Sequence, residues 1–179
     1  MPFVKFLKDD DDLKDIIQHR PHKFAGTAEL SQAILRGPSS LSEGDRELLA
    51  AVVSATNECP FCTGVHSAAA EGLGVDASFT RTIAEDIDSA PVDSKLKPLL
   101  KYVKKLTLTP YKMIQADADA VFAAGWDDDA LSDAILVCAL FNMANRIVDG
   151  HGISRQLPDA RLRERGALLA NSGYVRPEG

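Results

Sequence analysis

The sequence predicts an all-α protein. Apolar residues recur at three- and four-residue intervals along most of the 179 residues, and this is the period of a helix with one buried face. Helix-start signals precede two of the longest such stretches: Ser42 followed by Asp45, and the aspartates at 127–129. No segment shows the strict alternation of apolar and polar residues that is typical of a half-buried strand. The length suits one domain, so we expect a single domain over 1–179.

The helical period places the expected elements in order along the chain. The segment at 93–107 is the clearest, because Leu96, Leu99 and Val103 share one face and Thr109-Pro110 ends it. The apolar run at 134–141 is interpreted as the core of a buried helix. The first residues and the tail at 171–179 lack a period, so the terminal segments 1–20 and 171–179 are expected to be frayed ends or arms that embrace another subunit. The expected helices cover 10–19, 26–36, 43–57, 59–74, 77–87, 93–107, 113–124, 129–149 and 158–170.

Composition and charge exclude several classes of protein. With 45% hydrophobic and 26% charged residues the chain is an ordinary globular protein. A net charge of −6 provides no positive field for nucleic acid. No apolar stretch approaches the roughly 20 residues that span a bilayer, so no membrane association is expected. The N-terminus runs into four consecutive aspartates instead of the apolar core of a signal peptide, which predicts a cytoplasmic protein.

The stretch NECPFCTGVH at 57–66 carries the most specific chemical pattern. Cys59, Cys62 and His66 have offsets of zero, three and seven, so they share one face of a helix that begins near Pro60. The free amides and the dipole at a helix N-terminus favour a thiolate, so a lowered thiol pKa is expected here. A thiolate can attack a peroxide, and the second thiol can then close a disulfide on the sulfenic acid.

Peroxide reduction also needs a group that delivers a proton to the departing oxygen. His66 is one candidate, and Glu47 is the other because a helix hairpin closing near Asn57 would fold it back over the dithiol. Two alternatives stay open for the cysteines. The pattern can be without function, or Cys59, Cys62, His66 and His151 can form a zinc site, although no second C-x-x-C or H-x-x-x-H supports one. Cys138 lies in the apolar run and is interpreted as a buried hydrophobe.

These residues together resemble a known family. Glu47, eleven residues, Cys59-Pro-Phe-Cys62, three residues and His66 are similar to the E-x11-C-x-x-C-x-x-x-H signature of alkylhydroperoxidase D-like proteins in the carboxymuconolactone decarboxylase superfamily. The segments GPSSLSEGDRELLAAVVSATNECPFC, KLTLTP and FNMANRIVDGHG resemble its subgroup of uncharacterised peroxidase-related enzymes. The resemblance extends from about residue 20 to 152.

The resemblance implies an AhpD-like multi-helix bundle with the C-x-x-C at a helix N-terminus, and a homo-oligomer. It implies an antioxidant peroxidase or disulfide oxidoreductase that needs no cofactor or metal. In it Cys62 attacks a small hydroperoxide, Cys59 resolves, and Glu47 with His66 relays the proton. A dithiol reductant, such as lipoyl groups on an adaptor protein, would reduce the disulfide again. Phe61 departs from the family, where a relay histidine precedes the second cysteine.

Other functions stay open. The chain can be a binding protein whose dithiol senses redox state or is idle. It can also be a lactone decarboxylase-like enzyme that does not use the dithiol, because family membership alone does not fix a reaction. Asn142, Asn145 and Arg146 form a further polar cluster in a buried helix. They are interpreted as a polar network between helices or subunits, with binding of a substrate or partner as the alternative.

Overall fold

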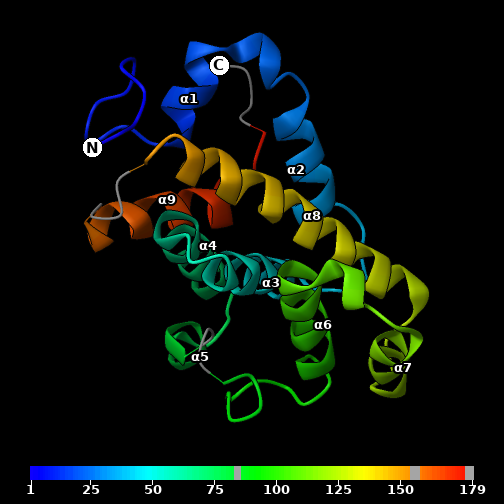
Figure 1. Ribbon diagram of the computed structural model, residues 1–179. Helices are drawn as coiled ribbons and strands as arrows, with labels where there is room; N and C mark the ends of the chain where they lie inside the picture. Colours follow the sequence, from blue (N-terminus) through cyan, green and yellow to red (C-terminus); the bar gives the residue numbers. More distant parts are fainter. Residues whose placement is uncertain (83–85, 154–157, 176–179) are drawn as a thin grey trace.

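The computed structural model describes residues 1–82, 86–153 and 158–175, and within these ranges every regular element is a helix (Figure 1). The predicted all-α fold class is therefore confirmed. Two short 3-10 helices lie at Pro21–Lys23 and Pro110–Lys112. The α-helices are α1 Leu13–His19, α2 Thr27–Arg36, α3 Glu43–Thr56, α4 Pro60–Gly72, α5 Ala77–Thr82, α6 Lys97–Leu108, α7 Gln115–Ala123, α8 Asp128–Gly150 and α9 Asp159–Ser172.

Each expected helix is present, and side-chain caps at Asp12, Ser42 and Asp127 start α1, α3 and α8. The Ser42 hydroxyl accepts a hydrogen bond from the Asp45 amide at 3.0 Å, and the Asp45 carboxylate accepts one from the Ser42 amide at 3.2 Å. This capping box starts α3 where the sequence predicted. The helix expected from residue 93 begins later, at Lys97, because a turn precedes it. The end expected near residue 87 follows 83–85, which lie outside the described residues.

Helix α3 forms the centre of the core. It contacts α2, α4, α6 and α8, and Figure 1 shows it enclosed among its neighbours. Because neighbours cover it on several sides, the run from Leu48 to Val53 is at most 1% exposed. The acidic side chain that precedes this run, Glu47, is consequently drawn into the interior with it.

Helix α8 is long and apolar enough to cross a membrane by length and composition alone. Its apolar side chains nevertheless have partners within the protein. Ala134, Val137, Cys138 and Phe141 are buried in the same core cluster as the residues of α3 and α6. The predicted buried helix at 134–141 is therefore a core helix of the fold, with Leu136 and Ala139 on its outer side.

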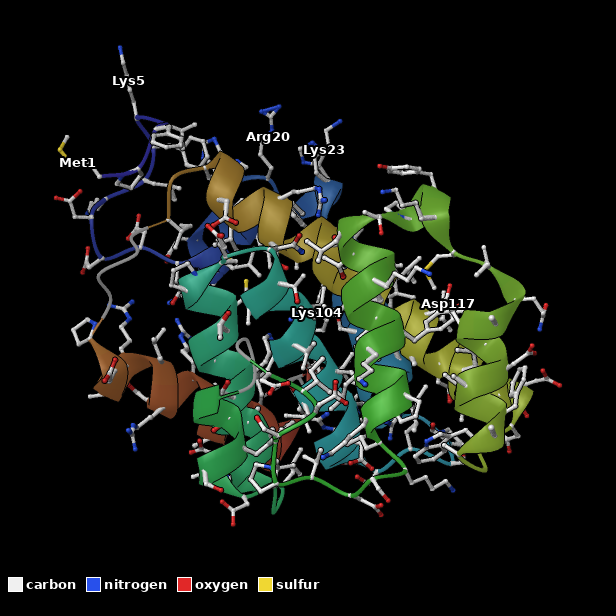
Figure 2. The ribbon with its side chains drawn as sticks, turned by 60° about the horizontal axis from the view of Figure 1, so that its bottom comes forward. Met1, Lys5, Arg20, Lys23, Lys104 and Asp117 are labelled. Carbon is white, nitrogen blue, oxygen red and sulfur yellow. The ribbon has the colours of Figure 1, made fainter. Side chains whose placement is uncertain are left out.

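Both chain ends pack on their own chain, as far as they are described. Leu7 and Ile16 turn inward and join Cys59 and Cys62 in a second core cluster, while Lys5, Arg20 and Lys23 project outward (Figure 2). Asp12, 2% exposed, caps α1 and pairs with Arg165 of α9 at 2.5 Å. At the other end the Tyr174 amide donates to the Gln32 side chain at 2.7 Å. Buried side chains thus anchor parts of 1–20 and 171–175 on their own chain, and contact of these ends with another subunit stays a prediction.

Small residues let α9 approach α4 closely. A Cβ added at Gly166 would lie 2.5 Å from the Ala68 Cβ and 2.6 Å from the Val65 carbonyl oxygen. Gly64 faces Leu162 in the same way, with 2.5 Å to a leucine methyl carbon. The contact between these helices thus requires glycine at Gly166, where a backbone atom of α4 comes within 2.6 Å of the added Cβ.

We predict that Gly166→Ala destabilises the protein by about 1–3 kcal/mol, because the added methyl group forces α9 away from α4. Gly150→Ala is the matched control. Its Cβ would meet nothing within 4 Å, so it should leave stability unchanged or raise it by about 0.4–1 kcal/mol. Urea unfolding followed by circular dichroism measures both. Equal midpoints for the two variants would contradict the close packing of α9 on α4.

Candidate active site

A tight connection between α3 and α4 sets the geometry of the site. Only Asn57, Glu58 and Cys59 separate the two helices, and exposed Glu58 adopts a φ of 55° to complete the reversal. Left-handed backbone is unusual for a residue with a Cβ, so this turn is specified by the helices on either side. Because the hairpin is antiparallel, Glu47 on α3 comes to face His66 on α4.

The two thiols lie at the start of α4, as the sequence predicted. Cys59 is the residue before the first helical turn, and Cys62 lies within that turn. Their exposed fractions are 0% and 2%. The covering side chains belong to the cluster that includes Leu7, Ile16 and Val148. The N-terminal segment and the end of α8 thus shield the dithiol from solvent.

Burial changes the acidity expected of Cys62. The pKa of the Cys62 thiol lies well above its ordinary value because of its hydrogen bond with Cys59, its burial, and repulsion by negative charge on Cys59. A hydrogen bond from Asn145 acts in the opposite direction. The lowered thiol pKa expected at this helix N-terminus is therefore wrong for Cys62, because a buried pair of sulfurs disfavours charge more than the helix start favours it.

Glu47 is a fully buried carboxylate that contacts His66 directly. The His66 Nδ1 lies 2.7 Å from Glu47 Oε2. Burial would raise the pKa of Glu47, but the hydrogen bond and charge of His66, together with those of Arg36, lower it below its ordinary value. An ionised carboxylate only accepts hydrogen bonds, so His66 Nδ1 carries the proton. The ring nitrogen Nε2 is then left for chemistry.

Two further residues complete the surroundings of Glu47. Its Oε1 accepts from Arg36 Nη2 at 2.6 Å and from the Tyr174 hydroxyl at 2.8 Å. The pKa of Tyr174 is raised well above its ordinary value by burial and by the charge of Glu47, so the hydroxyl keeps its proton. The sequence reasoning missed both residues. Arg36 merely ends a predicted helix, and Tyr174 lies in a tail without periodicity.

A cavity of about 690 Å³ opens beside this pair. Its walls are mostly apolar, and His66, Tyr174 and Arg165 contribute polar groups to it. Neither Cys59 nor Cys62 lines it, so His66 is the member of the predicted site that the cavity reaches. Phe61 occupies the position where the family that the sequence resembles has a relay histidine. Its side chain lies in the wall of the cavity rather than only in the core. The apolar lining residues are Leu13, Ile17, Phe61, Val65, Leu168 and Leu169.

An asparagine network joins the end of α3 to α8 on the other side of the thiols. The Asn57 amide donates to Asn145 at 2.9 Å and to Asn142 at 3.2 Å, and the Asn145 amide donates to Ser54 at 3.0 Å. Arg146 donates to the Asn142 backbone carbonyl at 2.8 Å. The predicted polar network between helices is therefore present. It also fixes the Asn145 amide nitrogen on the side of Ser54 and Cys62.

The residues of the zinc alternative do not come together as a group of four. His151 Nδ1 lies 2.7 Å from the carbonyl oxygen of Ile147 on its own helix. In the described part of the chain, no three His, Cys, Asp or Glu side chains are arranged to hold a metal ion.

A family comparison matches the part of the chain that carries this site. The model of the carboxymuconolactone decarboxylase family matches residues 21–89, which include Glu47, both cysteines and His66. No curated protein matches the chain.

Solved structures share the fold over most of the chain. An uncharacterised peroxidase-related protein from Silicibacter sp. TM1040 has 25% identity and a TM-score of 0.75, covering 85% of this chain and 78% of its own. An alkylhydroperoxidase AhpD core protein from Ralstonia eutropha JMP134, also described as peroxidase-related and uncharacterised, has 22% identity, a TM-score of 0.76 and the same coverage.

A third structure is shorter. It is a protein of unknown function from Agrobacterium tumefaciens, suggested to be an antioxidant defence protein AhpD. Its identity is 17% and its TM-score 0.69, and the alignment covers 83% of this chain and all of the other. The family match over residues 21–89 and the helical fold shared with these structures make the chain similar to the carboxymuconolactone decarboxylase family and to AhpD-like, peroxidase-related proteins.

Proposed function

We propose that the protein is a thiol-dependent hydroperoxide reductase or disulfide oxidoreductase that uses Cys62 and Cys59. The observation that carries the proposal is the 2.7 Å contact between buried Glu47 and His66, one helical turn after the C-x-x-C. A carboxylate that fixes the tautomer of a histidine, four residues after a thiol on the same helix, supplies the oriented base that general acid–base catalysis needs. The peroxidase-related descriptions of the similar structures support the same class of activity.

The chemistry follows from the protonation states. Because the pKa of Cys62 is raised, its thiol needs a base, and His66 Nε2 takes the proton. The Cys62 thiolate then attacks the terminal oxygen of the hydroperoxide and the O–O bond breaks. The departing alkoxide receives the proton from His66 and leaves as an alcohol, while Cys62 becomes a sulfenic acid.

The second half of the cycle uses the neighbouring thiol. The Cys59 thiol attacks the Cys62 sulfenic acid, a disulfide forms, and water leaves. A dithiol reductant, such as a lipoyl group, would reduce the disulfide to two thiols and become oxidised itself. In this scheme Glu47 orients His66 and stays ionised, and the cavity beside Phe61 and His66 holds the organic part of the hydroperoxide.

A homo-oligomer in the cytoplasm is part of the proposal. The outer side of α8 exposes Leu136, Ala139 and Met143 at intervals of three and four residues, and Leu136 and Met143 are 46% and 43% exposed. An apolar stripe of this kind suits contact with a second copy of the chain.

A second candidate function is acid–base catalysis on a lactone or a similar carbon acid, without use of the dithiol. The observation that favours it is that the cavity reaches His66 and neither cysteine. The His66 and Glu47 pair could then act as base and orienting group on a carbon acid. Turnover of a lactone by Cys62→Ser at the wild-type rate would favour this candidate.

We predict that Cys62→Ser abolishes peroxide turnover, whereas Cys59→Ser still forms a sulfenic acid, because only Cys62 receives the peroxide oxygen. Denatured intact mass after brief exposure to stoichiometric cumene hydroperoxide, with remaining thiols trapped, measures both. The wild type should lose two thiols as an intramolecular disulfide that dihydrolipoamide reverses. Cys138→Ser, which removes a buried thiol on α8, is the control and should behave as the wild type. An inert Cys59→Ser with an active Cys62→Ser would reverse the assigned roles.

We predict that His66→Ala and Glu47→Gln each slow thiol oxidation roughly 10- to 1000-fold, because the first removes the base and the second the group that orients it. Stopped-flow measurement of thiol loss at neutral pH gives the rates. His22→Ala and Glu29→Gln change exposed residues of the same types and serve as matched controls. Unchanged rates in His66→Ala and Glu47→Gln, with both variants folded by circular dichroism, would rule out the relay.

A further inference from the structure

The segment after α9 returns to the body of the protein and is held there by side chains of α2. Gly173 has a φ of 65°, which reverses the chain. The next residue, Tyr174, donates its amide to Gln32 Oε1 at 2.7 Å. A Cβ at Gly173 would lie 2.5 Å from the same oxygen. Glycine is therefore needed at this position for two reasons, the left-handed backbone and the closeness of Gln32.

The docked segment delivers a hydroxyl to the interior. Tyr174 donates to Glu47 Oε1 at 2.8 Å, and the Arg36 guanidinium lies 5.3 Å from the centre of the tyrosine ring. Arg36 also donates to Glu47 and to the Leu169 carbonyl of α9, at 2.6 and 3.1 Å. Arg36 and Tyr174 thus hold one carboxylate oxygen together, while His66 occupies the other.

We infer that Tyr174 is a positioning residue of the site. Its hydroxyl holds the Glu47 carboxylate in the orientation and ionised state that present His66 to its reaction, so the site is complete only when residues 173–175 are docked. The effect of Tyr174 on thiol oxidation rests on the proposed function, whereas its effect on the Glu47 carboxylate does not.

The charge balance around Glu47 predicts what the loss of this hydroxyl does. The groups that face Glu47 are Arg36 from α2, His66 from α4 and Tyr174 from the tail, with Arg46 and Glu43 nearby on α3 itself. Tyr174→Phe removes one donor from the buried anion and leaves the others in place. The pKa of Glu47 then rises, and the Glu47–His66 pair holds a proton more tightly.

The test compares Tyr174→Phe with Tyr111→Phe. Tyr111 is the control because it is 80% exposed and does not contact Glu47 or His66. The first readout is the carboxyl 13C resonance of Glu47, assigned by its absence in Glu47→Gln and followed against pH. The second is the rate of thiol oxidation against pH. We expect Tyr174→Phe to move the Glu47 midpoint and the acid limb of the rate profile up by about one pH unit. Tyr111→Phe should move neither.

Gly173→Ala provides a second variant that keeps the hydroxyl and weakens docking of the segment. It should shift the Glu47 midpoint in the same direction. A Glu47 midpoint that stays within about 0.2 pH unit of the wild type in both variants would overturn the inference, even if stability fell. If Tyr174→Phe shifts the Glu47 midpoint but the wild-type protein never oxidises its thiols, the proposed function is wrong and the positioning role of Tyr174 still stands.

Discussion

The buried carboxylate of Glu47 is the constraint on which the rest of the site depends. An ion without partners in a protein interior would cost several kcal/mol, so the fold must supply donors or the group must neutralise. Here it supplies three, from α2, α4 and the C-terminal segment. These elements are far apart in the sequence, and the Glu47 carboxylate that they all contact fixes how they pack together. The ionised state that results is what fixes the proton on His66 Nδ1.

The hairpin of α3 and α4 positions the other predicted site residues relative to Glu47. Its short connection leaves no freedom in how the two helices face each other, so the position of Glu47 determines that of His66. Since Cys59 and Cys62 begin the same helix as His66, the dithiol is placed by the same constraint. The small residues between α4 and α9 then let α9 close over this helix and carry the tail to Glu47.

Local signals in the sequence predicted the elements well, because caps and periodicity act within a few residues. The Ser42–Asp45 box, the start of α4 at Pro60 and the buried run of α8 are of this kind. The pairing of Glu47 with His66 was also within reach, since it follows from the length of one hairpin. The contacts of Arg36 and Tyr174 with Glu47 could not be predicted in this way. The Tyr174 hydroxyl, for example, meets a carboxylate 127 positions earlier in the chain. The raised pKa of Cys62 likewise depends on burial by side chains such as Leu7 and Ile16, which join the same core cluster from the distant N-terminal segment.

This cover has a consequence for how a dithiol can work here. A thiol with a raised pKa is a weak nucleophile at neutral pH, because reactivity follows the thiolate fraction. Under the proposed function the reaction must therefore wait for His66 to remove the proton. The cavity reaches His66 and stops short of the sulfurs, so a molecule bound there meets the base first. Coupling deprotonation to occupancy of the cavity would keep the dithiol unreactive toward small oxidants that do not bind. The apolar side chain of Phe61 in the cavity wall favours bulkier, less polar molecules as the ones that do.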